Sequence, residues 1–96
     1  MMIDGFELKV GALVEDHSPW FVEAWKEIHD DFGDGYCFHR YVRSNERFVL
    51  LKVTKEPLYG SEDELETGVA FFKVLSENGE TFWFRGHLKF IESVTQ

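Results

Sequence analysis

The strongest constraint on the fold lies in residues 69–92, where apolar and aromatic residues alternate with others on both sides of Asn78-Gly79. Asn-Gly is the preferred pair for a type I′ turn, the commonest two-residue connection between antiparallel strands. The segment therefore predicts a β-hairpin. A two-residue turn places Leu75 opposite Phe82 and Phe72 opposite Arg85.

This predicted register sorts the hairpin side chains onto two faces. One face carries Val69, Phe71, Leu75, Phe82, Phe84, Leu88 and Phe90. The other carries Phe72, Val74, Trp83, Arg85 and His87. The second face is unusually aromatic for a surface in water, and Arg85 lies within reach of ring faces for a cation–π contact. Aromatic and arginine side chains dominate protein interfaces, so Phe72, Trp83, Arg85 and His87 form a candidate partner-binding face.

A helix is predicted to begin at Ser18-Pro19, because serine is a good N-cap and proline is tolerated at the first helical position. The apolar positions that follow recur every three to four residues, and polar residues occupy the other side. The predicted apolar stripe consists of Trp20, Phe21, Ala24, Trp25 and Ile28. Gly33 and Gly35 are expected to end the helix, which would cover the aromatic face of the hairpin.

Three further strands are predicted from composition and alternation. Residues 6–14 alternate between apolar and other positions, as expected of a half-buried strand. Residues 36–43 and 47–55 are rich in aromatic and β-branched types, and the three residues between them suit a hairpin connection. The stretch 55–68 is predicted to be a loop, with a possible helical turn at the capping-box pair Ser61 and Glu64.

These elements predict an α+β fold in a single domain spanning residues 1–96. The expected architecture is an antiparallel β-sheet of about five strands, in the order β-α-β-β-β-β, with one amphipathic helix packed on it. An alternative makes residues 62–76 a second helix, which gives the ferredoxin-like order β-α-β-β-α-β. Thr67-Gly68 and the β-preferring Val69, Phe71, Phe72 and Val74 argue against that alternative.

Composition narrows the class of protein. Hydrophobic residues make up 44% of the chain, enough for a core without disulfides, and the one cysteine cannot form an internal bridge. No signal-peptide pattern opens the chain, and no apolar run approaches the roughly 20 residues that span a bilayer. We therefore expect a cytoplasmic protein with no membrane association.

The net charge of −8 argues against general affinity for nucleic acid, because phosphate binding depends on lysine and arginine. Residues 36–55 nevertheless carry five bases and one acid. Arg40, Arg43 and Arg47 are the alternative anion-binding residues of this segment, and they would serve binding of single-stranded nucleic acid.

The acids lie on either side of that basic segment. A surface that combined them would suit a basic partner, because complementary charge speeds association. The candidate acidic patch consists of Asp30, Asp31, Asp34, Glu62, Asp63, Glu64 and Glu66.

Motifs for catalysis or metal binding are absent from the sequence. Cys37 and His39 share a strand face, but adjacent same-face positions lie about 7 Å apart along the backbone, and no third group is identifiable. Residues 30–35 resemble a calcium loop only superficially, because Phe32 and Tyr41 fall where oxygen ligands belong. Four scattered histidines give no zinc spacing. We expect no metal and no cofactor.

Three functional hypotheses follow. The preferred one is a non-enzymatic module that binds another protein, as an acidic inhibitor, antitoxin or immunity-like factor does. The second is a small ligand-binding or enzymatic domain with a pocket between helix and sheet near Trp25, His39 and Trp83. The third is single-stranded nucleic-acid binding through residues 36–55. An open sheet face or edge strand would favour a homodimer.

Overall fold

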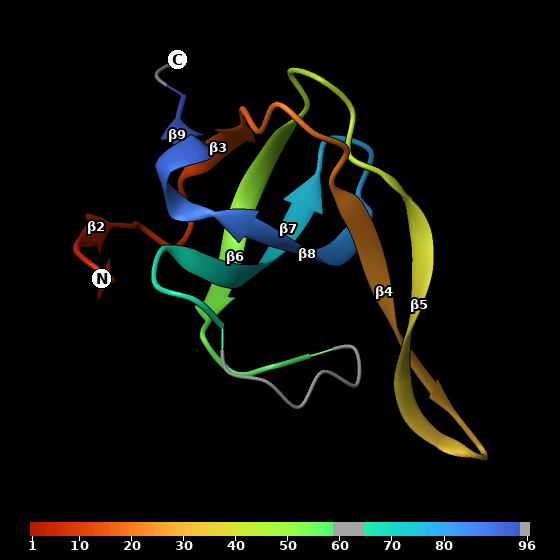
Figure 1. Ribbon diagram of the computed structural model, residues 1–96. Coiled ribbons are helices and arrows are strands. Elements are labelled where there is room, and N and C mark those ends of the chain that lie inside the picture. The colour runs from red at the N-terminus through yellow and green to blue at the C-terminus, as the bar shows by residue number, and fades with distance from the viewer. Residues whose placement is uncertain (59–64, 95–96) are drawn as a thin grey trace.

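The computed structural model describes residues 1–58 and 65–94 (Figure 1). These residues form short and long β-strands and a single turn of 3₁₀-helix, η1. The elements are β1 (Met2–Ile3), β2 (Phe6–Glu7), β3 (Leu13–Asp16), β4 (Glu23–Asp30), β5 (Gly33–Tyr41), β6 (Arg47–Thr54), β7 (Val69–Ser76), β8 (Thr81–His87), η1 (Leu88–Phe90) and β9 (Ile91–Ser93). Because η1 is the longest helix in this part of the chain, no helix there could span a membrane.

All strand pairings are antiparallel, and most join neighbours in the sequence. β1 and β2 form a two-stranded hairpin, and the other strands form one sheet in the order β5-β4-β8-β7-β6-β3-β9. After η1 the chain returns to β3, the first strand of this sheet along the sequence, and β9 pairs with it. β5 and β9 are therefore the two edge strands of this sheet (Figure 1).

The predicted amphipathic helix is wrong, and with it the predicted α+β class. Residues 23–30 form strand β4, paired with β5 on one side and β8 on the other. The sequence there fits a period of two as well as one of 3.6, since Val22 and Ala24 are buried while Glu23 is exposed. Pairing with strands distant in the sequence decides between the two periods, which local propensity cannot do. The structure is nearly all β.

The ferredoxin-like alternative is also wrong, because residues 69–76 form strand β7 and not the second half of a helix. Residues 59–64, including the capping-box pair Ser61 and Glu64, lie outside the described part of the chain.

The single strand predicted over residues 6–14 is divided. Phe6–Glu7 pairs with Met2–Ile3, and Gly11, with φ +91°, turns the chain before β3 begins at Leu13. Asp4 and Gly5 both have positive φ, as a type I′ hairpin turn requires. The Asp4-Gly5 pair is a sequence signal for this turn, which the prediction of a single strand over residues 6–14 did not use.

The hairpin over residues 69–87 is confirmed, but its predicted register is wrong by one residue. Val74 pairs with Phe82, and Phe72 pairs with Phe84. The backbone nitrogen of Gly79 donates to Ser76 O at 3.0 Å, and that of Ser76 donates to Glu80 O at 2.8 Å. The loop therefore has three residues with only Gly79 at positive φ, instead of a type I′ pair at 78 and 79.

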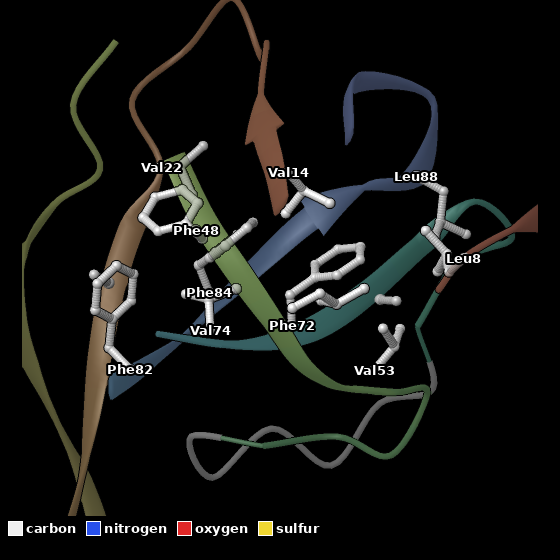
Figure 2. Packing of buried hydrophobic residues seen from close by; sticks show 13 residues of the cluster. Leu8, Val14, Val22, Phe48, Val53, Phe72, Val74, Phe82, Phe84 and Leu88 are labelled. Atoms are coloured by element: carbon white, nitrogen blue, oxygen red, sulfur yellow. The ribbon is translucent and has the colours of Figure 1, made fainter. Parts of the chain in front are cut away.

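The register change puts Phe72, Phe82 and Phe84 together on one face, the inner face of the sheet. Phe72 and Phe84 stack with ring centroids 5.3 Å apart, and Phe48 contacts Phe82 edge-on at 5.5 Å. Figure 2 shows these rings converging with side chains from the other strands. The inner core consists of Leu8, Val14, Val22, Ala24, Phe48, Leu50, Val53, Ala70, Phe72, Val74, Phe82, Phe84 and Leu88. Its tight packing of rings specifies the fold.

The packing of the inner core leaves no space for a side chain at Gly86 on β8. A Cβ atom at Gly86 would lie 3.1 Å from Cε2 of Phe72 and 3.1 Å from Cε2 of Phe84, and both rings are fully buried. Gly35 on β5 provides the contrast, because a Cβ atom there would meet nothing within 4 Å and its φ is not positive.

We predict that Gly86→Ala lowers the free energy of unfolding by about 1–3 kcal/mol, because the stacked rings must shift. Gly35→Ala should leave stability unchanged or raise it by roughly 0.4–1 kcal/mol, because it restricts the unfolded chain. Urea unfolding followed by circular dichroism measures both. Equal stability of the two variants would contradict this description of the core.

Candidate functional site

A continuous row of aromatic side chains lies on the outer face of the β4–β5 hairpin and at its base. Ring centroids are 5.5 Å apart for Phe21 and Tyr41, 5.2 Å for Tyr41 and Phe38, and 6.1 Å for Phe38 and Trp25. Phe21 is 85% exposed, Tyr41 51% and Phe38 45%. We call Phe21, Trp25, Phe38 and Tyr41 the aromatic row. Isolated exposed apolar residues are ordinary, but a contiguous set of this kind marks an interaction surface.

A β-bulge creates the row. β4 and β5 change register between Ala24, which pairs with Arg40, and Trp25, which pairs with Phe38, so His39 is the extra residue on β5. In a regular strand, residues three apart point to opposite faces. The extra residue lets Phe38 and Tyr41 share the outer face and contact one another.

Carboxylates border the row on β4. The indole nitrogen of Trp25 donates to Oε2 of Glu23 at 3.1 Å, and that of Trp83 donates to Oε1 of Glu27 at 2.5 Å. The hydrogen bond from Trp83 is the main cause that lowers the pKa of Glu27, with smaller contributions from His29 and Lys73. Glu27 is therefore ionised at neutral pH, and the row has a negatively charged border.

At the base of the hairpin the row leads into a groove of about 860 Å³. The groove lies between the chain segment 16–22, before β4, and the segment 41–45, after β5. Phe21 and Tyr41 line it and also belong to the row. Trp20, 48% exposed, lines it as well and packs edge-on against His87, with ring centroids 4.9 Å apart. The groove and the row thus form one surface.

The groove also contains a partly buried carboxyl group. Burial raises the pKa of Asp16, and the hydroxyl of Ser18, which donates to Asp16 Oδ1 at 2.8 Å, opposes that effect. The hydrogen bond from Ser18 thus holds the Asp16 carboxyl group at the wall of the groove.

On the inner side, a group of charged residues ties the hairpin to the β7–β8 turn. Glu80 accepts hydrogen bonds from Asn78 and from the His39 ring, and it lies 3.6 Å from Nη2 of Arg40. The Asn78 hydrogen bond, followed by that of His39, lowers the pKa of Glu80 to about 2. Glu80 therefore links the bulge residue to the opposite hairpin.

Arg40 is held firmly in this group. It makes two parallel bonds to Glu46, at 2.8 Å and 2.5 Å, and its guanidinium lies 5.0 Å from the ring centroid of Phe82. The bidentate pair with Glu46 is the main cause that raises the pKa of Arg40. The bulge is thus fixed from the inner side of the sheet.

The predicted aromatic face does not form one surface. Phe72 is buried in the inner core, and Trp83 points to the outer face, where Lys73 lies 5.9 Å from its ring centroid. Arg85 is exposed and pairs with Phe71 in the register, and His87 is half-buried against Trp20. The one-residue error in register is the reason for this division.

The predicted acidic patch is only partly described. Asp30, Asp31 and Asp34 lie together at the tip of the β4–β5 hairpin, and all three are exposed. Glu66 is exposed next to Gly68, whose backbone nitrogen donates to Asp4. Glu62, Asp63 and Glu64 lie outside the described residues.

The three arginines predicted as an anion site have different surroundings. Arg40 is paired with Glu46 and Glu80, and Arg47 lies 3.9 Å from Glu15. Arg43 is exposed and makes no salt bridge with any residue of 1–58 or 65–94.

No catalytic or metal centre is apparent in the described residues. Cys37 is free and exposed, and the His39 ring is bonded to Glu80. At the calcium-like segment, Asp30 accepts a hydrogen bond from the backbone nitrogen of Phe32 at 2.9 Å. Across residues 1–58 and 65–94, no three His, Cys, Asp or Glu side chains are grouped to hold a metal ion.

Phe21 is not among the site residues expected from the sequence, and Tyr41 enters only as part of segment 36–55, the alternative nucleic-acid surface. Phe21 belongs to the predicted stripe of a helix that the structure replaces with strand β4, and a strand without a bulge would place Phe38 and Tyr41 on opposite faces. The signal available was composition alone, namely the aromatic and basic content of residues 36–43.

The chain matches no known protein family, no curated protein and no solved structure.

We predict that Glu80→Gln lowers stability at neutral pH and changes its pH dependence. A carboxyl group with a lowered folded-state pKa stabilises the fold above its unfolded pKa and loses that contribution as pH falls through the folded value. For Glu80 this window runs from the ordinary value of 4.5 down to about 2. The difference in unfolding free energy between the natural protein and Glu80→Gln should therefore narrow steadily across the window.

Urea unfolding at neutral pH and at steps through that window measures the difference. Glu77→Gln in the same loop is the matched control, because Glu77 makes no ion pair with the described residues. A difference that stays constant with pH would show that Glu80 does not stabilise the hairpin through its charge.

Proposed function

We propose that this protein is a non-enzymatic module that binds another protein through the aromatic row and the adjoining groove. The observation that carries the proposal is the continuous contact of four partly or largely exposed aromatic rings, Phe21, Tyr41, Phe38 and Trp25. Such rings lose little conformational freedom on binding and bury large apolar areas, which makes them effective anchors at interfaces.

The rigidity of the surface supports the same proposal. Arg40 and Glu80 fix the bulge from the inner side, so the backbone that carries Phe38 and Tyr41 is ordered before any partner arrives. A preorganised surface spends less of its interaction energy on ordering side chains. The row and groove together suit an extended segment of a partner, laid along the hairpin with apolar side chains between the rings.

The charge around the row indicates a basic partner. Glu23 and Glu27 border the rings, and three aspartates lie at the hairpin tip. Together with the net charge of −8, this supports the class of acidic inhibitor, antitoxin or immunity-like factor that occupies a basic surface. A cytoplasmic location belongs to the same proposal, supported by the single unpaired cysteine.

The other two hypotheses have less support. The pocket between helix and sheet has no counterpart, because β4 occupies the residues assigned to the helix. Binding of single-stranded nucleic acid would depend on Arg43 alone among the three predicted arginines, because Arg40 and Arg47 are engaged with carboxylates. We therefore propose neither.

Selection from a random peptide library displayed on phage tests the proposal with a defined probe. We expect the protein to enrich peptides that combine apolar and basic residues. Phe21→Ser with Tyr41→Ser should weaken binding of the enriched peptides roughly tenfold or more, because interface anchors of this kind contribute about 2 kcal/mol or more.

Phe32→Ser is the matched control. Phe32 is 100% exposed at the hairpin tip, so its removal deletes an exposed phenylalanine outside the row. Binding that is lost equally in Phe32→Ser, or no enrichment above an unrelated protein, would contradict the proposed function.

A further inference from the structure

The groove at the base of the β4–β5 hairpin is bridged by backbone pairing at both ends. The chain segments before β4 and after β5 form its two walls. At one end the backbone nitrogen of Val42 donates to Val22 O at 2.8 Å, and at the other end Glu15 of β3 pairs with Arg47 of β6. A groove bounded in this way suits a single inserted side chain better than a continuous length of backbone.

A carboxyl group without a cationic partner lines this groove. Asp16 is half-buried, and no lysine, arginine or histidine in the described part of the chain makes an ion pair with it. The neighbouring His17 instead lies 3.5 Å from Glu92 and 3.9 Å from Glu15. Burial raises the pKa of Asp16, as expected of a carboxyl group that leaves water without gaining a cation. A cation supplied by a ligand would offset that cost.

The positive groups near Asp16 do not compensate it. His17 and His87 follow burial and the Ser18 hydrogen bonds among the causes of its pKa shift, and the net shift is upward. Arg43 lines the opposite wall of the groove and acts on Asp16 less than either histidine does. The groove therefore lacks positive charge where the carboxylate lies.

We propose that the groove holds one lysine side chain of the partner protein, with its ammonium group at the Asp16 carboxylate and its methylene stem against the aromatic rings. The three rings that line the groove are those of Trp20, Phe21 and Tyr41. The inference rests on the proposed function, because the lysine belongs to the segment that lies along the aromatic row. It adds which group that segment must carry and where the group binds.

The aromatic rings suit both parts of a lysine side chain. Phe21 and Tyr41 come from opposite walls, with ring centroids 5.5 Å apart, and Trp20 packs against His87 at 4.9 Å. Methylene groups bury favourably against such rings while the charged end stays at a polar group. Ring faces also attract a cation, which adds to the attraction of the carboxylate. The groove thus combines an apolar lining with a negative charge.

The remaining hydrogen-bonding capacity of Asp16 favours lysine over arginine. The Ser18 hydroxyl donates to Oδ1 at 2.8 Å, which leaves Oδ2 the freer oxygen. An ammonium group is a compact point charge that one oxygen can bind. A guanidinium group gains its advantage by binding both carboxylate oxygens at once, and Ser18 competes for one of them. We therefore expect lysine to bind more tightly than arginine.

Titration with Nα-acetyl-lysine methylamide tests the site with a defined probe. NMR chemical shifts are followed at mildly alkaline pH, where imidazole groups ordinarily carry no charge. We expect saturable shifts at the Trp20 indole and in the segments 16–22 and 41–45, with a dissociation constant on the order of 10 mM. The arginine analogue should bind roughly threefold more weakly. The norleucine analogue, which has the same stem without the ammonium group, should bind about tenfold more weakly or less.

Asp16→Asn tests the role of the carboxylate. Asparagine keeps the size of the side chain and an oxygen that accepts from Ser18, so the groove should retain its shape. The dissociation constant for the lysine probe should rise about fivefold or more, because a charge-assisted bond is lost.

Glu92→Gln is the matched control. It removes one exposed carboxylate from β9, beside His17 and outside the groove. It should change the dissociation constant less than about twofold, because exposed charges interact weakly. Circular dichroism verifies that both variants fold.

Four results would overturn the proposal. Absence of saturable shifts would show that the groove does not bind the probe, and equal binding of the lysine and norleucine probes would show that it does not recognise the charge. Both results come from the natural protein and need no variant. A dissociation constant that Asp16→Asn raises no more than Glu92→Gln does would show that Asp16 is not the binding group. Tighter binding of the arginine probe would contradict the assignment to lysine.

The peptides enriched from the phage library separate this inference from the proposed function. Their binding should weaken about fivefold in Asp16→Asn, and replacing one peptide lysine by norleucine should then cause no further loss. Peptides that require Phe21 and Tyr41 but bind Asp16→Asn unchanged would support the proposed function and overturn the lysine site. Binding of the lysine probe at Asp16 without any enriched peptide would support the site and contradict the proposed function.

Discussion

The hydrogen bond from the Ser76 backbone nitrogen to the carbonyl oxygen of Glu80 determines the arrangement of most of this structure. It closes a three-residue loop and so sets which residues of β7 and β8 face each other. A loop shorter by one residue would turn Phe72 away from Phe84 and place each on a different face. That closure brings Phe72 and Phe84 into their stacked contact, which leaves no room for a side chain at Gly86. It also places Phe82 where the buried ring of Phe48 packs against it.

The same loop also organises the surface on the β4–β5 hairpin. Glu80, the residue that closes it, contacts His39 and Arg40 from the inner side of the sheet. His39 is the extra residue of the bulge, and the bulge aligns Phe38 with Tyr41. The Glu80 carboxylate therefore connects two features: the register of β7 against β8 in the core, and the bulge that aligns Phe38 with Tyr41 on the proposed binding surface.

Much of the strand content could be read from the sequence, and the errors have identifiable causes. The hairpin around residues 77–79 was predicted because its turn residues and β-branched neighbours are local signals. The hairpin predicted around residues 44–46 is wrong: strands form on both sides, but β5 pairs with β4, and β6 pairs with β7 and β3. The helix was a wrong prediction, because Ala24 fits a helical period with Trp25 and Ile28 and also a strand period with Val22, and only pairing with β5 and β8 selects one. The aromatic row could not be predicted, because it depends on an insertion in the ladder at His39 that alternation does not reveal.

The distribution of tryptophan has a practical consequence for spectroscopy. The inner core contains phenylalanine as its only aromatic residue type, and Trp20, Trp25 and Trp83 all lie outside it. Two of the three indoles donate to carboxylates, and the third packs on a histidine ring beside the groove. Trp83 is buried, whereas Trp20 is exposed and Trp25 half-buried, so the emission of Trp20 and Trp25 reports on the outer surface of the molecule. It will respond directly when that surface is occupied, whereas loss of the core is better followed through the backbone signal.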